Sequence, residues 1–256
     1  MPTLLAVTPH PDDEAYGFGG TIALASAAGW RCVVACATRG EGGERHDRWW
    51  SRWVPTGRKR GAELAAACGT LGAVAPRFLG FRDGTLRAGD PEGPARVAEL
   101  LTELEPDLVL ALGADGAYGH PDHLAVYAWT REAVAGARTK PVLLFAAFPP
   151  GLMRPQYELC RAAGVLGEPP AFEPEQLGVA HPHYVVSIAR VAGTKLAAIA
   201  AHRSQLPGGD PLRLFPAGVV SQLTEREGFV DASGNASPQT LTLLQSFAPG
   251  AESSES

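Results

Sequence analysis

Short and almost wholly apolar runs recur along this chain, and segments with helical spacing separate them. The apolar runs are Thr3–Thr8, Arg31–Thr38, Pro76–Phe81, Asp107–Leu112, Pro141–Phe148 and Tyr184–Ile188. The segments that favour helices are 21–28, 58–71, 94–105, 123–135 and 191–202. Strands that are apolar along their whole length are typical of parallel sheets buried between helices. We therefore predict an α/β fold with a mainly parallel sheet and helices on both of its faces.

The length of 256 residues suits one large domain or two small ones. The rhythm of strands and helices predicts a single domain over residues 1–248. The region 149–183 contains seven prolines and interrupts this rhythm, so we interpret it as an irregular insertion or flap. Residues 249–256 are mostly small, polar or acidic, which is typical of a flexible tail.

Charge and composition exclude several classes of protein. The formal net charge is −5, and the chain therefore lacks the basic footprint of a general nucleic-acid binder. No run reaches 18 apolar residues and the first residues do not form a signal peptide, so we expect no membrane association. Four cysteines without a CxxC pair are typical of a reduced, cytoplasmic protein.

Polar side chains follow four of the predicted strands, at the point where each strand ends. The segments are Pro9–Glu14, Thr38–Glu44, Arg82–Gly84 and Gly113–His123. In open α/β sheets, ligands bind beyond the carboxyl ends of the strands. Acids, histidines and a tyrosine are thus predicted to meet at one edge of the sheet.

These residue types suit a catalytic metal. Zn²⁺ in enzymes takes three imidazole or carboxylate ligands and leaves one position open. His10, one of Asp12 or Asp13, and one of His120 or His123 would complete such a set. The acids could instead serve only the N-termini of the following helices. Two such segments after two strands of one sheet make the metal site the stronger interpretation.

The chain also resembles a known family. Pro9–Glu14 with Gly19–Thr21, Thr38–Glu41 and His120–His123 are similar to segments of the LmbE-like, or PIG-L, family of zinc-dependent N-deacetylases. The similarity extends over residues 3–206. The family has a Rossmann-like fold and acts mainly on N-acetylglucosamine-linked substrates, including intermediates of mycothiol and bacillithiol biosynthesis. The resemblance implies a hydrolase that removes an N-acetyl group from a glucosaminide-type small molecule.

The resemblance assigns roles residue by residue. His10, Asp13 and His123 match the zinc ligands, and Asp12 matches the general base. His120 and Tyr118 match residues that stabilise the oxyanion. One Zn²⁺ per chain is therefore expected, although Fe²⁺ or Co²⁺ could occupy the same ligands.

Further polar residues are candidates for substrate binding or for support of the metal ligands. Their expected roles are a contact to a polar substituent, orientation of a ligand, a hydrogen bond to sugar hydroxyls, or a partner for a metal histidine. The candidates are Arg39, Glu41, Arg45, Asp83 and His202. The tryptophans Trp49, Trp50 and Trp53 could stack on a sugar ring or form a subunit contact, which leaves a homo-oligomer open.

Other functions remain in competition with N-deacetylation. The chain could be an amidase for a larger or thiol-conjugated amide, or a non-catalytic metal- or sugar-binding module with the same fold. A nucleotide-binding enzyme is disfavoured, because Gly17, Gly19 and Gly20 do not form a G-x-G-x-x-G motif. The strand Tyr184–Ile188 lacks the acidic residue that the family often carries there, which weakens inference about the C-terminal third.

Overall fold

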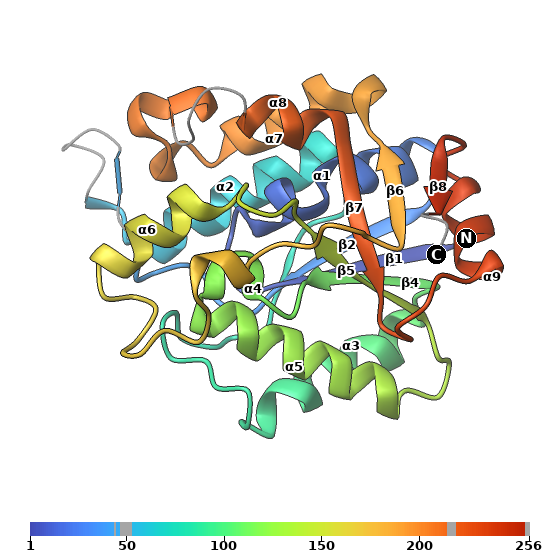
Figure 1. Cartoon of the computed structure of the whole chain (residues 1–256), viewed down its shortest axis with the longest axis horizontal. Helices are drawn as coiled ribbons and strands as arrows, with labels where there is room; N and C mark the ends of the chain where they lie inside the picture. Colours follow the sequence, from blue (N-terminus) through green and yellow to red (C-terminus); the bar gives the residue numbers. More distant parts are fainter. Residues whose placement is uncertain (44, 47–52, 214–218, 254–256) are drawn as a thin grey trace.

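A computed structural model describes residues 1–43, 45–46, 53–213 and 219–253. At its centre is an eight-stranded sheet with the order β3-β2-β1-β4-β5-β7-β6-β8 (Figure 1). The strands are β1 Thr3–Thr8, β2 Arg31–Cys36, β3 Arg77–Phe78, β4 Leu108–Leu112, β5 Val142–Ala147, β6 Tyr184–Ser187, β7 Arg226–Asp231 and β8 Ala251–Ser253. Strands β1 to β5 pair in parallel, whereas β7 pairs antiparallel with β5 and β6, and β8 antiparallel with β6.

Helices cover both faces of this sheet, as predicted. Figure 1 shows α1, α2 and α7 above the sheet and α3 and α5 below it. Alternate side chains of β1 accordingly enter two cores: Leu4 and Ala6 pack on one side, Leu5 and Val7 on the other. The helices are α1 Asp13–Ala27, α2 Thr56–Leu71, α3 Glu92–Leu104, α4 Gly116–Gly119, α5 Pro121–Gly136, α6 Arg154–Ala162, α7 Ala192–Ala201, α8 Val219–Glu225 and α9 Pro238–Gln245.

The structure departs from the predicted elements mainly in the C-terminal half. Strand β7 was not predicted, because two of its three buried residues, Glu227 and Asp231, are acidic and no apolar pattern results. The region 149–183 contains α6 as well as irregular backbone. Ala251–Ser253, within the predicted tail, pair with β6 as strand β8. Among the described residues, no helix is long and apolar enough to cross a membrane.

Helix α1 is broken at Phe18, whose φ of −153° and ψ of 23° are not helical. The break releases backbone groups, and a buried ion pair satisfies them. Lys195 Nζ donates to the carbonyl oxygen of Tyr16 at 2.9 Å, and the Glu227 carboxylate accepts from the backbone N–H groups of Gly20 and Thr21, each at 2.8 Å. Lys195 and Glu227 lie 2.6 Å apart and are buried. The pair therefore fixes the first turns of α1 from the C-terminal part of the chain.

Replacing Lys195 by methionine is expected to lower the free energy of unfolding by about 3–5 kcal/mol, because the Glu227 carboxylate would remain buried without its cation. Urea or guanidinium unfolding measures this change. The matched control is Lys140→Met, since Lys140 is exposed; its effect should stay within about 0.5 kcal/mol. Equal stability of the two variants would contradict the role given to the pair.

Candidate active site and metal centre

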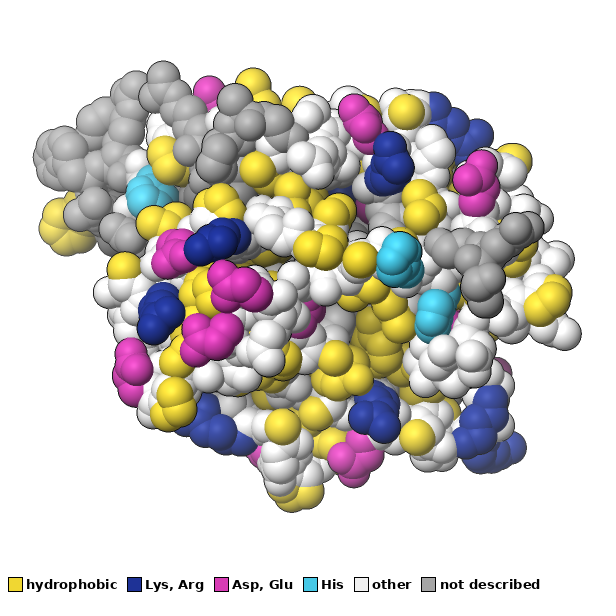
Figure 2. All heavy atoms as spheres, viewed as in Figure 1, with side chains coloured by type: hydrophobic (Ala, Val, Ile, Leu, Met, Phe, Trp, Pro, Cys, Tyr) yellow, Lys and Arg dark blue, Asp and Glu magenta, His cyan; other side chains and the backbone are white. Residues whose placement is uncertain are grey.

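A cavity of about 780 Å³ opens where β1 and β4 end at their carboxyl ends. Its lining includes the predicted site residues His10, Asp12, Asp13, Tyr118 and His120. Residues of α6 line another part of it, whereas the outer face of α6 carries ion pairs such as Arg154–Glu158. Figure 2 shows basic and acidic side chains gathered over this helix. The lining in and around α6 includes Met153, Leu159 and Ala163, so the cavity is polar at the strand ends and more apolar beside α6.

Three ligand atoms converge beside this cavity. His10 Nδ1 lies 3.3 Å from His123 Nε2 and 3.5 Å from Asp13 Oδ2, and His123 Nε2 lies 3.6 Å from Asp13 Oδ1. Ligands placed about 2.0–2.2 Å from a tetrahedral zinc ion are roughly 3.3–3.6 Å from one another. The two imidazoles and the carboxylate thus fit a metal ion in both chemistry and spacing.

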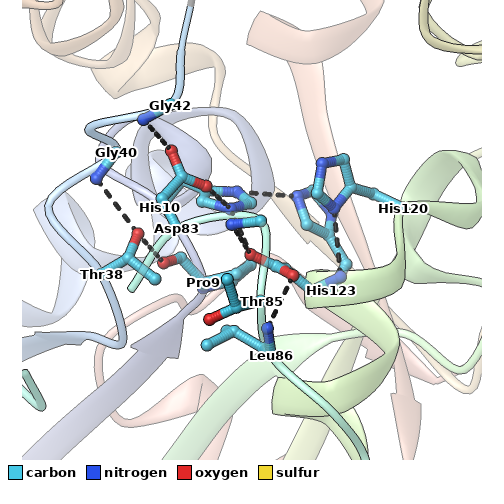
Figure 3. Close-up of polar contacts among 12 residues, drawn as sticks. Pro9, His10, Thr38, Gly40, Gly42, Asp83, Thr85, Leu86, His120 and His123 are labelled. Carbon is cyan, nitrogen blue, oxygen red and sulfur yellow. Dashed lines mark hydrogen bonds and ion pairs between the residues drawn. The ribbon is translucent and has the colours of Figure 1, made fainter. Parts of the chain in front are cut away.

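The remaining ring nitrogens of both histidines have partners that orient them. His123 Nδ1 donates to the carbonyl oxygen of Gly116 at 3.0 Å, which leaves the lone pair of Nε2 for the cluster. His10 Nε2 faces Asp83 Oδ1 at 3.0 Å (Figure 3), and it lies 3.2 Å from Asp122 Oδ2. Such partners fix the tautomer and ring position of metal-binding histidines.

Asp83 and Asp122 together with His10 form a second group of ligand-type side chains. These two carboxylates also accept backbone N–H groups, from Gly42 for Asp83 and from Gly84 and Leu86 for Asp122. Burial opposes protonation of His10, but hydrogen bonds to Asp122, Asp13 and Asp83 outweigh it and raise the pKa of His10 well above its ordinary value. We interpret this second group as the support of the His10 ring.

Asp12 occupies a strained turn between β1 and α1, with φ of 118° and ψ of −30°. Its backbone N–H donates to Glu14 Oε2 at 3.0 Å, and its carboxylate accepts from Arg60 Nη2 at 3.1 Å. Burial raises the pKa of Asp12 to about 6, although Arg60 opposes that rise. The carboxylate lines the same cavity as the candidate ligands His10 and Asp13 without taking part in the three-atom cluster.

A buried network supports this turn from below. Glu14 Oε1 pairs with His202 Nε2 at 2.7 Å, and both side chains are almost fully buried. Arg60 also donates to the carbonyl oxygens of Pro11 at 2.7 Å and Gly40 at 3.1 Å. Helices α1 and α2 and the end of α7 are thereby tied to the backbone around Asp12.

His120 and Tyr118 face the same cluster from the loop after β4. His120 Nδ1 accepts the backbone N–H of Asp122 at 3.1 Å, so a neutral ring carries its proton on Nε2. Burial and the neighbouring His123 and His10 lower the pKa of His120 to about 3, which keeps the ring neutral. The Tyr118 hydroxyl lies 3.4 Å from His123 Nε2. Both side chains can donate a hydrogen bond next to the cluster.

The predicted supporting residues lie in different surroundings. Asp83 lines the cavity, whereas His202 pairs with Glu14 beneath it. Arg39 is exposed and stacks on the ring of Phe78 at 4.0 Å, and Arg45 donates to the carbonyl oxygen of Val54 at 2.6 Å. Glu41 is exposed and accepts the backbone N–H of Asp83 at 3.1 Å. Arg39, Glu41 and Arg45 are not among the residues that line the cavity in the described part of the chain.

Trp49 and Trp50 lie outside the described residues, while Trp53 is described and 87% exposed.

Three neighbours of the cluster had no predicted role. Arg60 holds Asp12, Asp122 faces His10, and Glu14 binds the Asp12 backbone. Glu14 belongs to the motif Pro9–Glu14 and Asp122 to the motif His120–His123, and Arg60 is the first residue of the segment Arg60–Glu63 on α2. The charged side chains in these segments were the sequence feature from which a role in the site could have been predicted.

Comparisons with known proteins identify relatives of this chain. The profile of the family described as PIG-L, GlcNAc-PI de-N-acetylase, matches residues 5–134. A 1D-myo-inositol 2-acetamido-2-deoxy-alpha-D-glucopyranoside deacetylase of Salinispora arenicola is 31% identical over 269 residues, covering 92% of this chain and 86% of the relative. A protein of the same name from Rhodococcus erythropolis is 38% identical over 158 residues, which cover 53% of this chain and 54% of the relative.

The alignment with the Rhodococcus erythropolis protein, like that with a protein of the same name from Rhodococcus jostii, spans only about half the length of each protein. Among solved structures, a conserved protein of Thermus thermophilus superimposes with a TM-score of 0.62 and 28% identity. That superposition covers 90% of this chain and 94% of the other. The same arrangement of sheet and helices thus extends over nearly the whole chain.

Proposed function

The chain belongs to the PIG-L family, and from this membership we propose that it is a metal-dependent N-deacetylase that acts on an N-acetylglucosamine-type small molecule. The observation that carries the proposal is the convergence of His10 Nδ1, His123 Nε2 and an Asp13 carboxylate oxygen beside Asp12. We further propose Zn²⁺ as the ion, because it is commonly bound by two imidazoles and one carboxylate in hydrolases.

Each side chain around the three candidate ligand atoms has its own role in the proposed amide hydrolysis. Zn²⁺, when bound, supplies a Lewis acid and lowers the pKa of water toward about 7. In the proposal Asp12 accepts a proton from the attacking water and returns it to the leaving amine. The Nε2–H of His120 and the hydroxyl of Tyr118 donate to the carbonyl oxygen as negative charge develops there. Arg60 and Glu14 hold Asp12 in the turn that makes this possible.

The test combines metal content with amine release. The purified protein, loaded with zinc, is expected to contain about one metal ion per chain, as measured by elemental analysis. It should release amine from N-acetylglucosamine or its glycosides, and a chelator should stop this release until zinc is restored. Bound metal without release from any glucosaminide would shift the proposal to another amide. Failure to bind metal would leave a binding module in place of an enzyme.

A further inference from the structure

A second cavity, of about 600 Å³, lies at the same edge of the sheet as the three candidate ligand atoms of His10, Asp13 and His123. It is found beyond the last residues of β5 and the first residues of β7, with further walls from 148–152 and 179–182. Tyr16, Gly17 and Phe148 line this cavity and also the cavity of the candidate active site. The two cavities are therefore neighbours with a shared wall.

Gly17 stands at the boundary between them. A Cβ atom at this position would lie 3.3 Å from Leu112 Cδ2 and 3.9 Å from Ala146 Cβ. Leu112 lines the active-site cavity and Ala146 the second one. A larger side chain at position 17 would therefore press on Leu112 at the boundary between the two cavities.

The inner wall of the second cavity is mainly apolar. Small or aliphatic side chains contribute much of it, among them Ala146, Ala147, Leu152, Val185 and Leu223. Lys195 and Glu227 also line it, but they bind each other and the broken backbone of α1. The exposed side chains of His181 and Arg226 belong to its solvent side. An apolar occupant suits such a wall, because it needs no hydrogen bonds in exchange for those it loses from water.

One side of the active-site cavity has a polar lining and the other side a more apolar one. This difference orients a substrate. The side chains of Arg60 and Asp83 are polar groups of its lining, while Phe148 lines the second cavity as well. An N-acylated amino sugar has the same division, since its hydroxyl groups are polar and its acyl group is its apolar end. With the sugar on the polar side and the amide at the cluster, the acyl group points toward Gly17 and Phe148.

We propose that the second cavity is an acyl-chain subsite, and that the preferred substrate is an N-acylated amino sugar with an acyl group longer than acetyl. This inference rests on the proposed function, because it requires amide hydrolysis at the cluster. The oxygen of water bonds to the acyl carbon, the C–N bond breaks, and the nitrogen leaves as the protonated or neutral amine. The products are the free amino sugar and a carboxylic acid.

The test compares N-acetyl-, N-butyryl-, N-hexanoyl- and N-octanoylglucosamine with the zinc-loaded protein, by release of amine. Each methylene that enters an apolar wall contributes up to about fourfold to kcat/KM. The hexanoyl amide is therefore expected to exceed the acetyl amide in kcat/KM by at least about tenfold. The gain should level off once the chain fills the cavity.

Filling the subsite should remove this preference. Val185→Phe places a ring in the second cavity, and Val185 does not line the active-site cavity. Hexanoyl turnover is expected to fall at least tenfold, while kcat/KM for the acetyl amide stays within about twofold. Val179→Phe, in the loop wall, provides a second variant if the first fails to fold. Val74→Phe is the matched control, since Val74 is 44% exposed and lies outside both linings.

Three results would overturn the subsite. The wild-type protein could cleave the acetyl amide and reject the hexanoyl amide, which would leave the proposed function intact. Folded Phe variants could lose acetyl and hexanoyl turnover equally, and this too would spare the function. A metal-loaded protein that releases no amine from any of the four amides would overturn the proposed function together with the subsite.

Discussion

In an Asp12→Asn variant, kcat for amide hydrolysis is expected to fall by a factor of about 10²–10⁴, while the metal content stays at the wild-type level. The amide of asparagine keeps the shape of the side chain and can still accept a hydrogen bond from Arg60 Nη2, now 3.1 Å from the carboxylate. It cannot accept a proton from water. Asp12 also stands apart from the three-atom ligand cluster, so the metal loses no ligand.

The measurement pairs steady-state amine release with elemental analysis of the same sample. Asp90→Asn is a suitable control, because Asp90 accepts the backbone N–H of Glu92 at 3.0 Å at the start of α3, outside the cavity lining. That variant should keep wild-type kcat. Substantial turnover by Asp12→Asn would remove Asp12 from the role of general base, whereas loss of metal would place it among the ligands.

In a His123→Ala variant, the protein is expected to lose both bound metal and activity. His123 is 1% exposed and offers one of the three candidate ligand atoms, and the methyl group of alanine cannot replace its Nε2. Zinc at 100 times its dissociation constant stabilises a wild-type site by about 2.7 kcal/mol. Addition of zinc should therefore raise the Tm of the wild-type protein and leave the Tm of the variant unchanged.

Thermal unfolding with and without zinc measures this difference, and equilibrium dialysis measures the metal directly. His181→Ala is the matched histidine control, because His181 is exposed and lies outside the lining of the active-site cavity. Its zinc-dependent rise in Tm should equal that of the wild type. A full equivalent of zinc on His123→Ala would mean that another set of side chains binds the ion.

The sequence predicted those parts of the fold in which local pattern and burial agree. Strands β1 and β4 are buried along their whole length, and their apolar runs predicted them correctly. Strand β7 was missed because two of its three buried residues, Glu227 and Asp231, are acidic, and the burial of Glu227 depends on Lys195 and on the break in α1. Residues far away in the sequence stabilise such a strand, so a prediction from the local sequence pattern misses it.

The candidate site was predictable as a set of residues but not as an arrangement. The spacing of PHPDDE left Asp12 and Asp13 equivalent, and the resemblance alone separated them. In the structure, the positive φ of Asp12 turns the backbone between the two acids, and Asp13 reaches His10 and His123. Arg60 could not be assigned to Asp12 from sequence, since 48 positions separate them and the contact arises only when α2 packs beside α1.

The broken helix α1 has a consequence for the order in which the candidate site can form. All three ligand atoms belong to the first 123 residues, yet the turns that carry Asp13 are bound to Lys195, 179 positions beyond Tyr16, and to Glu227. Contacts of such high sequence separation form late, because long loops must close first. A nascent chain on the ribosome would therefore contain the three candidate ligand residues long before they reach their final positions. We expect metal binding only after the strand that carries Glu227 has joined the sheet.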